Sequence, residues 1–175
     1  MGSLLLMPTT GELNVDYHHY GSKYEKETAS PGYYSLQLTK YNIKVEATST
    51  LRTGLTRFTF PKGKSHILMN LGEGLTNESG AYLRRINDRE IEGMKFLGTF
   101  CYNPQAVFPI YFVMRINKAP KQTGYWKFQR KMTGVEAEMG TKTMANTSCT
   151  RSMTGIWLAT TSVHGSLSIQ KKMNR

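Results

Sequence analysis

Residues 107–118, with the sequence VFPIYFVMRINK, predict the fold of the chain. Alternate residues of an extended strand lie on opposite faces, and here both faces are apolar. One face carries Phe108, Ile110, Phe112, Met114 and Ile116, and the other carries Val107, Tyr111 and Val113. The pattern predicts a strand in the middle of a sheet that is covered on both sides. Because Pro109 disfavours a helix and a strand that begins before it, we expect the strand to begin at Ile110.

The composition of the whole chain favours an all-β domain. Its 175 residues have the length of one domain, and β-branched and aromatic residues are frequent. Sixteen glycines interrupt the sequence, and helical periodicity is scarce. About nine short strands without crossover helices predict an antiparallel β-sandwich, in which two sheets bury alternate side chains between them.

The other predicted strands follow from alternating apolar positions between turn-forming residues. They are Tyr34–Leu38 and Ile43–Ala47, joined by a turn at 40–42; Leu51–Phe60; Ile67–Leu71; and Tyr82–Ile86 and Glu90–Phe96, joined across Asn87 and Asp88. Residues 8–11 are expected to form a turn, and residues 14–30 and 97–108 are expected to form loops.

The net charge of +11 is concentrated near the end of the chain. Residues 1–120 hold 14 Lys/Arg against 10 Asp/Glu, whereas residues 121–175 hold 9 against 2. A basic tail can bind nucleic acid through its phosphates, but no stacking-aromatic or helix-turn-helix pattern accompanies this charge. We therefore expect no nucleic-acid partner. We expect no membrane span either, since the central apolar run is far shorter than roughly 20 residues.

No residue pattern predicts a catalytic or metal site. Glycoside hydrolysis needs two carboxyl groups about 5–5.5 Å apart for retention or 6.5–9.5 Å for inversion, and the acidic residues here fall in loops, turns or beside lysines. His18 and His19 lack a third ligand at zinc spacing. Cys101 has no nucleophile motif around it, and its single possible partner, Cys149, leaves the redox compartment undecided.

Five stretches, in order, resemble the N-terminal domain of glycoside hydrolase family 92, the calcium-dependent exo-acting α-mannosidases. They are LLMPTTGEL (5–13), ASPGYYS (29–35), RFTFP (57–61), NDREIEG (87–93) and PIYFV (109–113). The resemblance extends over residues 4–118. It implies an incomplete β-sandwich of the galactose-mutarotase-like (supersandwich) kind, in agreement with the strand pattern.

In enzymes of this family the domain packs on an (α/α)6 barrel, which supplies the general acid, the general base and the calcium ligands for hydrolysis with inversion. The resemblance therefore implies a non-catalytic N-terminal fragment, with no catalytic residue and no calcium site of its own. Its expected partners are α-mannosides and the missing catalytic domain. Full-length members are periplasmic or secreted, and residues 4–7 are too short an apolar run to be a signal peptide.

The resemblance also points to the loop that contains Phe100 and Tyr102, which is expected to face the barrel. Either aromatic ring could contact substrate by stacking on a sugar ring, and the alternative is that both cover the end of the sandwich or the barrel interface. A further alternative for the whole chain is a stand-alone carbohydrate-binding or interaction module.

The resemblance ends near Glu138, which divides the chain into a partial sandwich at 1–138 and an atypical tail at 139–175. The tail holds twelve Ser/Thr, five Lys/Arg and no Asp/Glu. Our hypothesis is that a shifted reading frame encodes it. One strand is still conceivable in the tail, at Ile156, Trp157 and Leu158.

Overall fold

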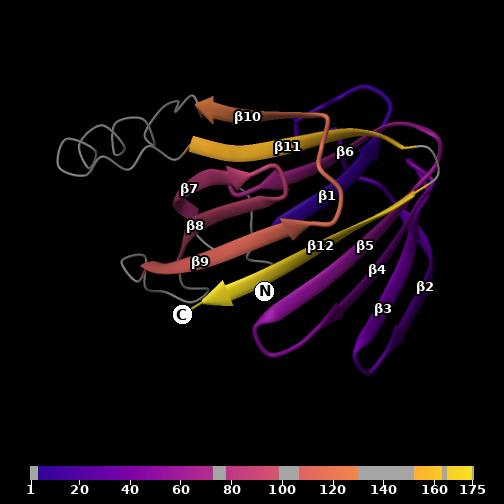
Figure 1. Cartoon of the computed structure of the whole chain (residues 1–175), viewed down its shortest axis with the longest axis horizontal. Helices are drawn as coiled ribbons and strands as arrows, with labels where there is room; N and C mark the ends of the chain where they lie inside the picture. Colours follow the sequence, from indigo (N-terminus) through magenta and orange to yellow (C-terminus); the bar gives the residue numbers. More distant parts are fainter. Residues whose placement is uncertain (1–3, 73–77, 99–106, 130–151, 163–164, 175) are drawn as a thin grey trace, which may run out of the picture.

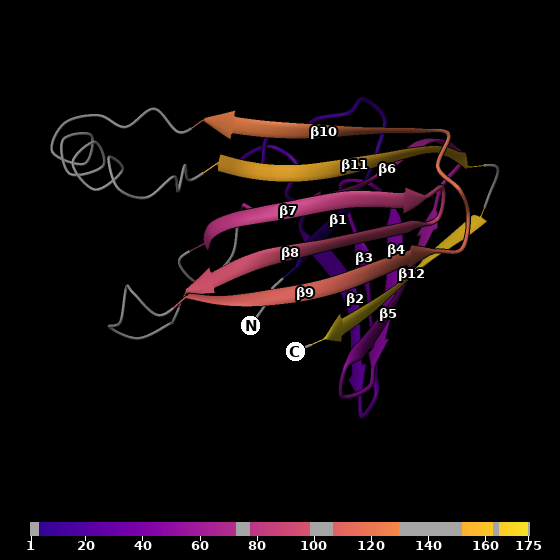
Figure 2. The same ribbon diagram turned by 60° about the vertical axis from the view of Figure 1, so that its left-hand side comes forward.

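The computed structural model describes residues 4–72, 78–98, 107–129, 152–162 and 165–174. These residues form twelve β-strands in two antiparallel sheets and no helix, so none of them belongs to a helix that could cross a membrane. The predicted all-β sandwich is confirmed. Figure 1 and Figure 2 show the smaller sheet lying across one side of the larger one.

Both sheets mix strands from distant parts of the sequence. The four-stranded sheet has the order β1 (Leu5–Thr10), β6 (Gly63–Asn70), β11 (Ser152–Ser162) and β10 (Gln122–Gln129). The eight-stranded sheet has the order β2 (Tyr24–Ser30), β3 (Tyr33–Leu38), β4 (Ile43–Ser49), β5 (Thr53–Phe60), β12 (Gly165–Asn174), β9 (Val107–Ile116), β8 (Glu90–Gly98) and β7 (Glu78–Asn87).

The hydrophobic core lies between the two sheets. Ile67, Met69 and Leu158 contribute from the small sheet, and Phe58 and Met114 contribute from the large one. All five are almost completely buried. Along β5 the buried residues Phe58 and Phe60 alternate with outward-facing ones, and along β9 Phe112, Met114 and Ile116 do the same, which is the arrangement that period-two alternation predicts.

The central strand β9 differs from its prediction in two respects. It begins at Val107, not Ile110, and continues through Pro109. Among the described residues, β12 pairs with β9 only from Tyr111 onward. No described strand therefore pairs with Pro109 on that side, and a residue without an N–H is tolerated there. The expectation that both faces are covered is wrong for this chain, because Phe112 is buried while Tyr111 is half exposed.

Three other predicted boundaries also change. β1 runs through Pro8 instead of turning there, and it lies at the edge of the small sheet, where proline is allowed. Residues 24–30 form strand β2, not a loop, and β2 is exposed along its whole length. β5 begins at Thr53 because Leu51 lies in an exposed turn.

The predicted hairpins are present. β3 pairs with β4 in the register Leu36 to Val45. β7 pairs with β8 across a turn at Asp88 and Arg89, one residue later than predicted, because Asn87 still pairs with Glu90. Gly32, in the turn that launches β3, has a φ of 78°, a conformation that glycine adopts without strain.

The last part of the chain enters both sheets. β11 lies between β6 and β10, and β12 lies between β5 and β9, so each has a strand on both sides. Residues 130–151, which contain the predicted domain boundary at 138, lie outside the described residues, and that boundary stays a prediction.

Candidate functional site

The predicted substrate-binding residues Phe100 and Tyr102 lie outside the described residues. The strands on either side of them are described: β8 ends at Gly98 and β9 begins at Val107, and these two residues pair with each other. The role assigned to the two aromatic residues remains a prediction.

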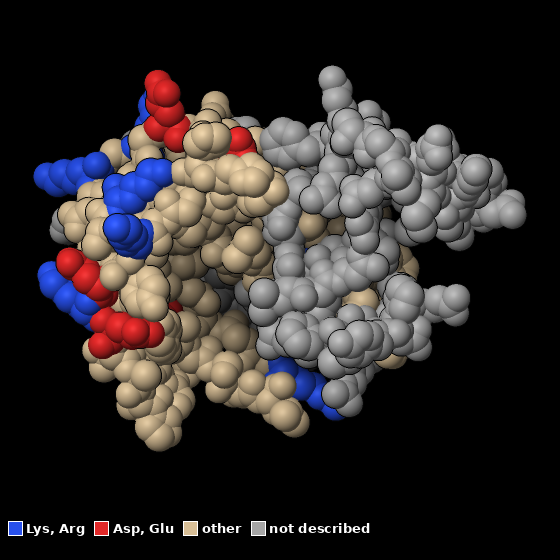
Figure 3. Space-filling model, turned by 180° about the vertical axis from the view of Figure 1, so that it is seen from behind, with Lys and Arg blue, Asp and Glu red and all other residues tan. Residues whose placement is uncertain are grey.

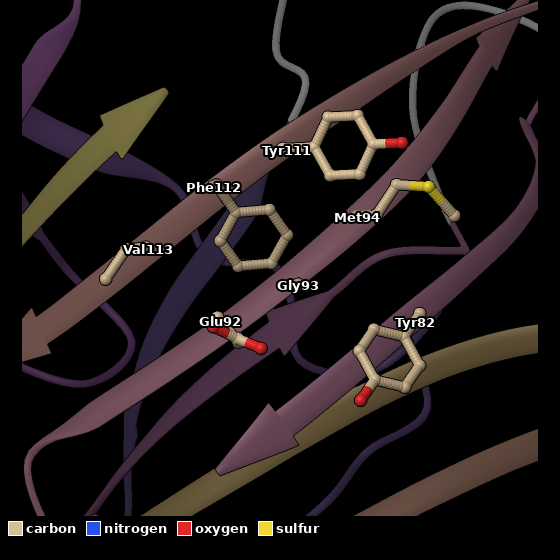
Figure 4. A pocket seen from close by; sticks show the side chains of 7 residues that line it. All are labelled: Tyr82, Glu92, Gly93, Met94, Tyr111, Phe112 and Val113. Carbon is tan, nitrogen blue, oxygen red and sulfur yellow. The ribbon is translucent and has the colours of Figure 1, made fainter. Parts of the chain in front are cut away.

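A hollow lies on the outward face of the large sheet. Tyr82 on β7, Met94 on β8 and Tyr111 on β9 lie directly opposite one another in the strand register. Each tyrosine is 50% exposed. Between them lies a hollow of about 330 Å³, which Glu92, Gly93, Phe112 and Val113 complete (Figure 4).

Gly93 and Phe112 form the base of this hollow. They are cross-strand partners, and Phe112 is buried in the core. A Cβ atom at position 93 would lie 2.6 Å from Cζ of Phe112 and 2.6 Å from the carbonyl oxygen of Tyr82. Only glycine fits this position without displacing the ring or the neighbouring backbone. The absence of a side chain at 93 therefore lets Phe112 pack directly against β8.

Charged pairs border the hollow on the side towards the β7–β8 turn. Arg84 donates from Nε to Oε1 of Glu92 at 2.8 Å, and Arg115 donates from Nε to Oε2 of Glu90 at 3.1 Å. Both contacts that Arg84 makes with Glu92 use Oε1, so Oε2 remains able to accept a further hydrogen bond. We call the outward face of β7, β8 and β9 the aromatic half of the sheet.

The outward face of β2 to β5, which we call the polar half, is built around Glu46. The two oxygens of its carboxylate accept hydrogen bonds from Nε and Nη2 of Arg57, both at 2.8 Å. One of them also accepts from Oη of Tyr33 at 2.8 Å and from Nζ of Lys44 at 3.2 Å. The Arg57 hydrogen bonds, followed by that from Tyr33, lower the pKa of Glu46 to about 2. The group is an ionised structural anchor and not a proton donor near neutral pH.

Most other acidic side chains also have a hydrogen-bonding or charged partner within the chain. Apart from Glu12, which lies on the surface, every carboxylate with a described side chain has a hydrogen-bonding or charged partner. The pairs are Asp16 with His19, Glu25 with Lys26, Glu27 with Tyr34, Glu46 with Arg57, Asp88 with Arg85, Glu90 with Arg115 and Glu92 with Arg84. Among the residues coloured in Figure 3, most acidic and basic side chains lie interspersed along one edge of the view.

The buried histidine does not form a general base with these groups. His66 lies on β6 opposite Thr9 of β1, and burial, reinforced by the nearby Lys64, lowers its pKa. No described side chain hydrogen-bonds its Nδ1 atom, so no described carboxylate holds the ring through that nitrogen. Within the part of the chain that the structure describes, no group of three His, Cys, Asp or Glu residues could hold a metal ion.

Sequence reasoning placed Tyr82 and Tyr111 on strands but did not bring them together. They are distant in the sequence, and the hollow exists only because β7, β8 and β9 pair in one register. The one available signal was that both faces of residues 107–118 are apolar.

The comparisons with known proteins agree with the sandwich architecture. The model of the glycosyl hydrolase family 92 N-terminal domain matches residues 1–160. The chain belongs to glycosyl hydrolase family 92. No curated protein matches the chain.

Solved structures of family 92 enzymes share the fold. A family GH92 α-mannosidase from Bacteroides thetaiotaomicron superposes with a TM-score of 0.77 at 22% identity, covering 99% of this chain and 24% of that chain. The same protein has also been solved in complex with mannoimidazole. An inverting mannosidase of the family from the same organism superposes with a TM-score of 0.69 at 15% identity, covering 98% of this chain and 21% of that one. The chain thus spans about a quarter of the length of these relatives.

Proposed function

We propose that the chain is the non-catalytic N-terminal part of an inverting α-mannosidase, and that it supports and walls a sugar site completed by a separate (α/α)6 catalytic domain. The observation that carries the proposal is the match to the family 92 N-terminal domain over residues 1–160, in a chain that spans about a quarter of solved family members.

The calcium ion that the family resemblance implies does not fit the residues described in this chain. They offer no set of three clustered acidic or histidine side chains, whereas calcium takes six to eight oxygen ligands. We propose that the ion belongs to the catalytic domain. On the resemblance alone, we also propose a periplasmic or secreted location for the full-length protein.

Phe100 and Tyr102 are the residues we propose to contact the sugar. In the sequence they fall between β8, which ends at Gly98, and β9, which begins at Val107, and those two residues pair with each other. A loop held between two paired strands can place an aromatic ring against a neighbouring domain with little loss of conformational freedom. Such a ring would offer a flat apolar surface to the C–H face of a sugar.

A chimaera tests this proposal. The chain would replace the corresponding N-terminal domain of the Bacteroides thetaiotaomicron α-mannosidase, and hydrolysis of an aryl α-mannoside would be followed. We expect measurable activity, and we expect Phe100→Ala or Tyr102→Ala to raise KM while Tyr24→Ala, an exposed site on β2, leaves it unchanged. A chimaera that melts cooperatively but has no activity would contradict the proposed role.

A further inference from the structure

The aromatic half of the sheet has features that the core does not require. Tyr82 and Tyr111 each leave half of their surface in solvent. They lie on opposite sides of Met94 in the strand register, and both line the hollow (Figure 4). Two exposed rings in register on one sheet face form a pair of apolar walls with polar hydroxyl tips.

The hollow has the anatomy of a small-ligand site. Its volume of about 330 Å³ falls at the lower end of the roughly 300–1,000 Å³ typical of such sites. Its base is rigid, because the Gly93 backbone and the buried Phe112 ring leave no space for a side chain to enter. Polar groups converge at its border, where Glu92 Oε2 can accept a hydrogen bond that Arg84 does not supply.

We propose that this hollow binds one neutral hexopyranose residue of an α-mannoside, at a site separate from the β8–β9 connection. A pyranose ring presents an apolar C–H face, which suits the tyrosine walls, and hydroxyl groups at its edge, which can donate to the Glu92 carboxylate. The choice of mannose as the sugar rests on the proposed function. The presence of a sugar-sized aromatic hollow does not.

The charged border favours a small polar ligand over a protein partner. The ion pairs Arg84–Glu92 and Arg115–Glu90 lie on the same outward face, next to the row formed by Tyr82, Met94 and Tyr111. A specific protein interface needs about 800 Å² on each partner with an apolar centre depleted in charge, and a single aromatic row beside two ion pairs does not provide that. A ligand that uses both the rings and the carboxylate fits better.

With this site the domain would itself bind the glycan, in addition to supporting the sugar site of the catalytic domain. Occupying it would hold one residue of a branched or extended mannoside against the sandwich. The bound segment would then be kept at high effective concentration near a catalytic domain tethered to the same chain. A single-residue site of this kind is expected to be weak, so its contribution would be to retain the substrate and not to cleave it.

Saturation-transfer difference NMR of methyl α-mannoside with the 175-residue chain tests the proposal. We expect transfer from methyl α-mannoside to the unaltered chain, and we expect Tyr82→Ala or Tyr111→Ala to lower the apparent affinity about tenfold. Tyr111→Phe should keep the affinity of the unaltered chain, because the aromatic ring remains. Tyr24→Ala is the matched control, since this exposed tyrosine on β2 lies in the opposite half of the sheet. We expect it to bind like the unaltered chain.

Two results would overturn the inference. One is an absence of transfer from methyl α-mannoside, or transfer that both alanine variants leave unchanged. The other is self-association of the unaltered chain in sedimentation velocity that Tyr111→Ala abolishes, which would make the hollow a contact between copies. Either result leaves the proposed function standing if the chimaera is active, so the two failures are distinguishable.

Discussion

The two halves of the eight-stranded sheet share one core but carry different side chains on their outward faces. In the polar half, Glu46 gathers Arg57, Lys44 and Tyr33 into one hydrogen-bonded group. In the aromatic half, Tyr82 and Tyr111 stand on either side of a hollow. The first arrangement satisfies its polar groups within the chain. The second holds two half-exposed rings on either side of a hollow, where we propose that a sugar binds.

The largest effects should come from the core beneath both halves. Phe58→Ala under the polar half and Phe112→Ala under the aromatic half should each lower the free energy of unfolding by about 3–5 kcal/mol, because both rings are buried. Urea unfolding measures this. Leu51→Ala is the control, since Leu51 is 94% exposed and its loss should change little. If Phe112→Ala proved nearly neutral, the aromatic half would not share the core.

Breaking the polar half should have the next largest effect, and the effect should depend on pH. Glu46→Gln removes charge-assisted hydrogen bonds worth roughly 1.5–3 kcal/mol near neutral pH. Because the pKa of Glu46 is lowered from its usual 4.5 to about 2, this stability is present above pH 4.5 and is lost as the pH falls towards 2. Unfolding of both proteins between pH 7 and pH 2 should converge at the acid end. A difference that is constant with pH would exclude the ion pair as its cause.

The aromatic half should be sensitive to a single methyl group at its base. Gly93→Ala places Cβ 2.6 Å from Phe112 and from the Tyr82 carbonyl oxygen, and should cost about 1–3 kcal/mol in unfolding free energy. Gly54→Ala on β5 has nothing within 4 Å of its added Cβ and serves as the matched change in the polar half. Equal thermal midpoints for the two variants would show that Phe112 does not pack as described.

The smallest effects should separate the tyrosines of the two halves. Tyr33→Phe loses the hydroxyl that donates to Glu46 and should lower the unfolding free energy by about 1 kcal/mol. Tyr111→Phe should stay within roughly 0.5 kcal/mol of the unaltered chain, because its exposed ring makes no comparable contact. Guanidinium unfolding of both variants would check the difference. A larger loss for Tyr111→Phe would mean that its hydroxyl has a structural role.

The sequence predicted those parts of the fold that one strand can encode by itself. Alternation identified β3, β4, β7 and β8, and the Asn87–Asp88 pair located the β7–β8 turn to within one residue. It could not identify β2, because the residues YEKETAS are exposed throughout and show no apolar alternation. The pairing partners of β11 and β12 were also beyond reach, since these strands join neighbours about a hundred residues earlier in the chain, β6 and β5.

The site was less predictable than the fold for a related reason. The family resemblance directed attention to Phe100 and Tyr102, a prediction that remains open. The hollow depends on which residues of three strands become neighbours. Shifting the register of β9 by a single residue would turn Tyr111 towards the core and remove the hollow altogether. A site of this kind is encoded in the pairing and not in any motif.

The most direct test of the central claim is an assay of the purified 175-residue chain with 4-nitrophenyl α-mannoside and calcium, beside the full-length Bacteroides thetaiotaomicron α-mannosidase. If the reacting groups lie in another domain, the full-length enzyme releases nitrophenol and this chain does not, although it is folded by circular dichroism. Nitrophenol release that stays with the purified chain through successive chromatography columns would contradict the account.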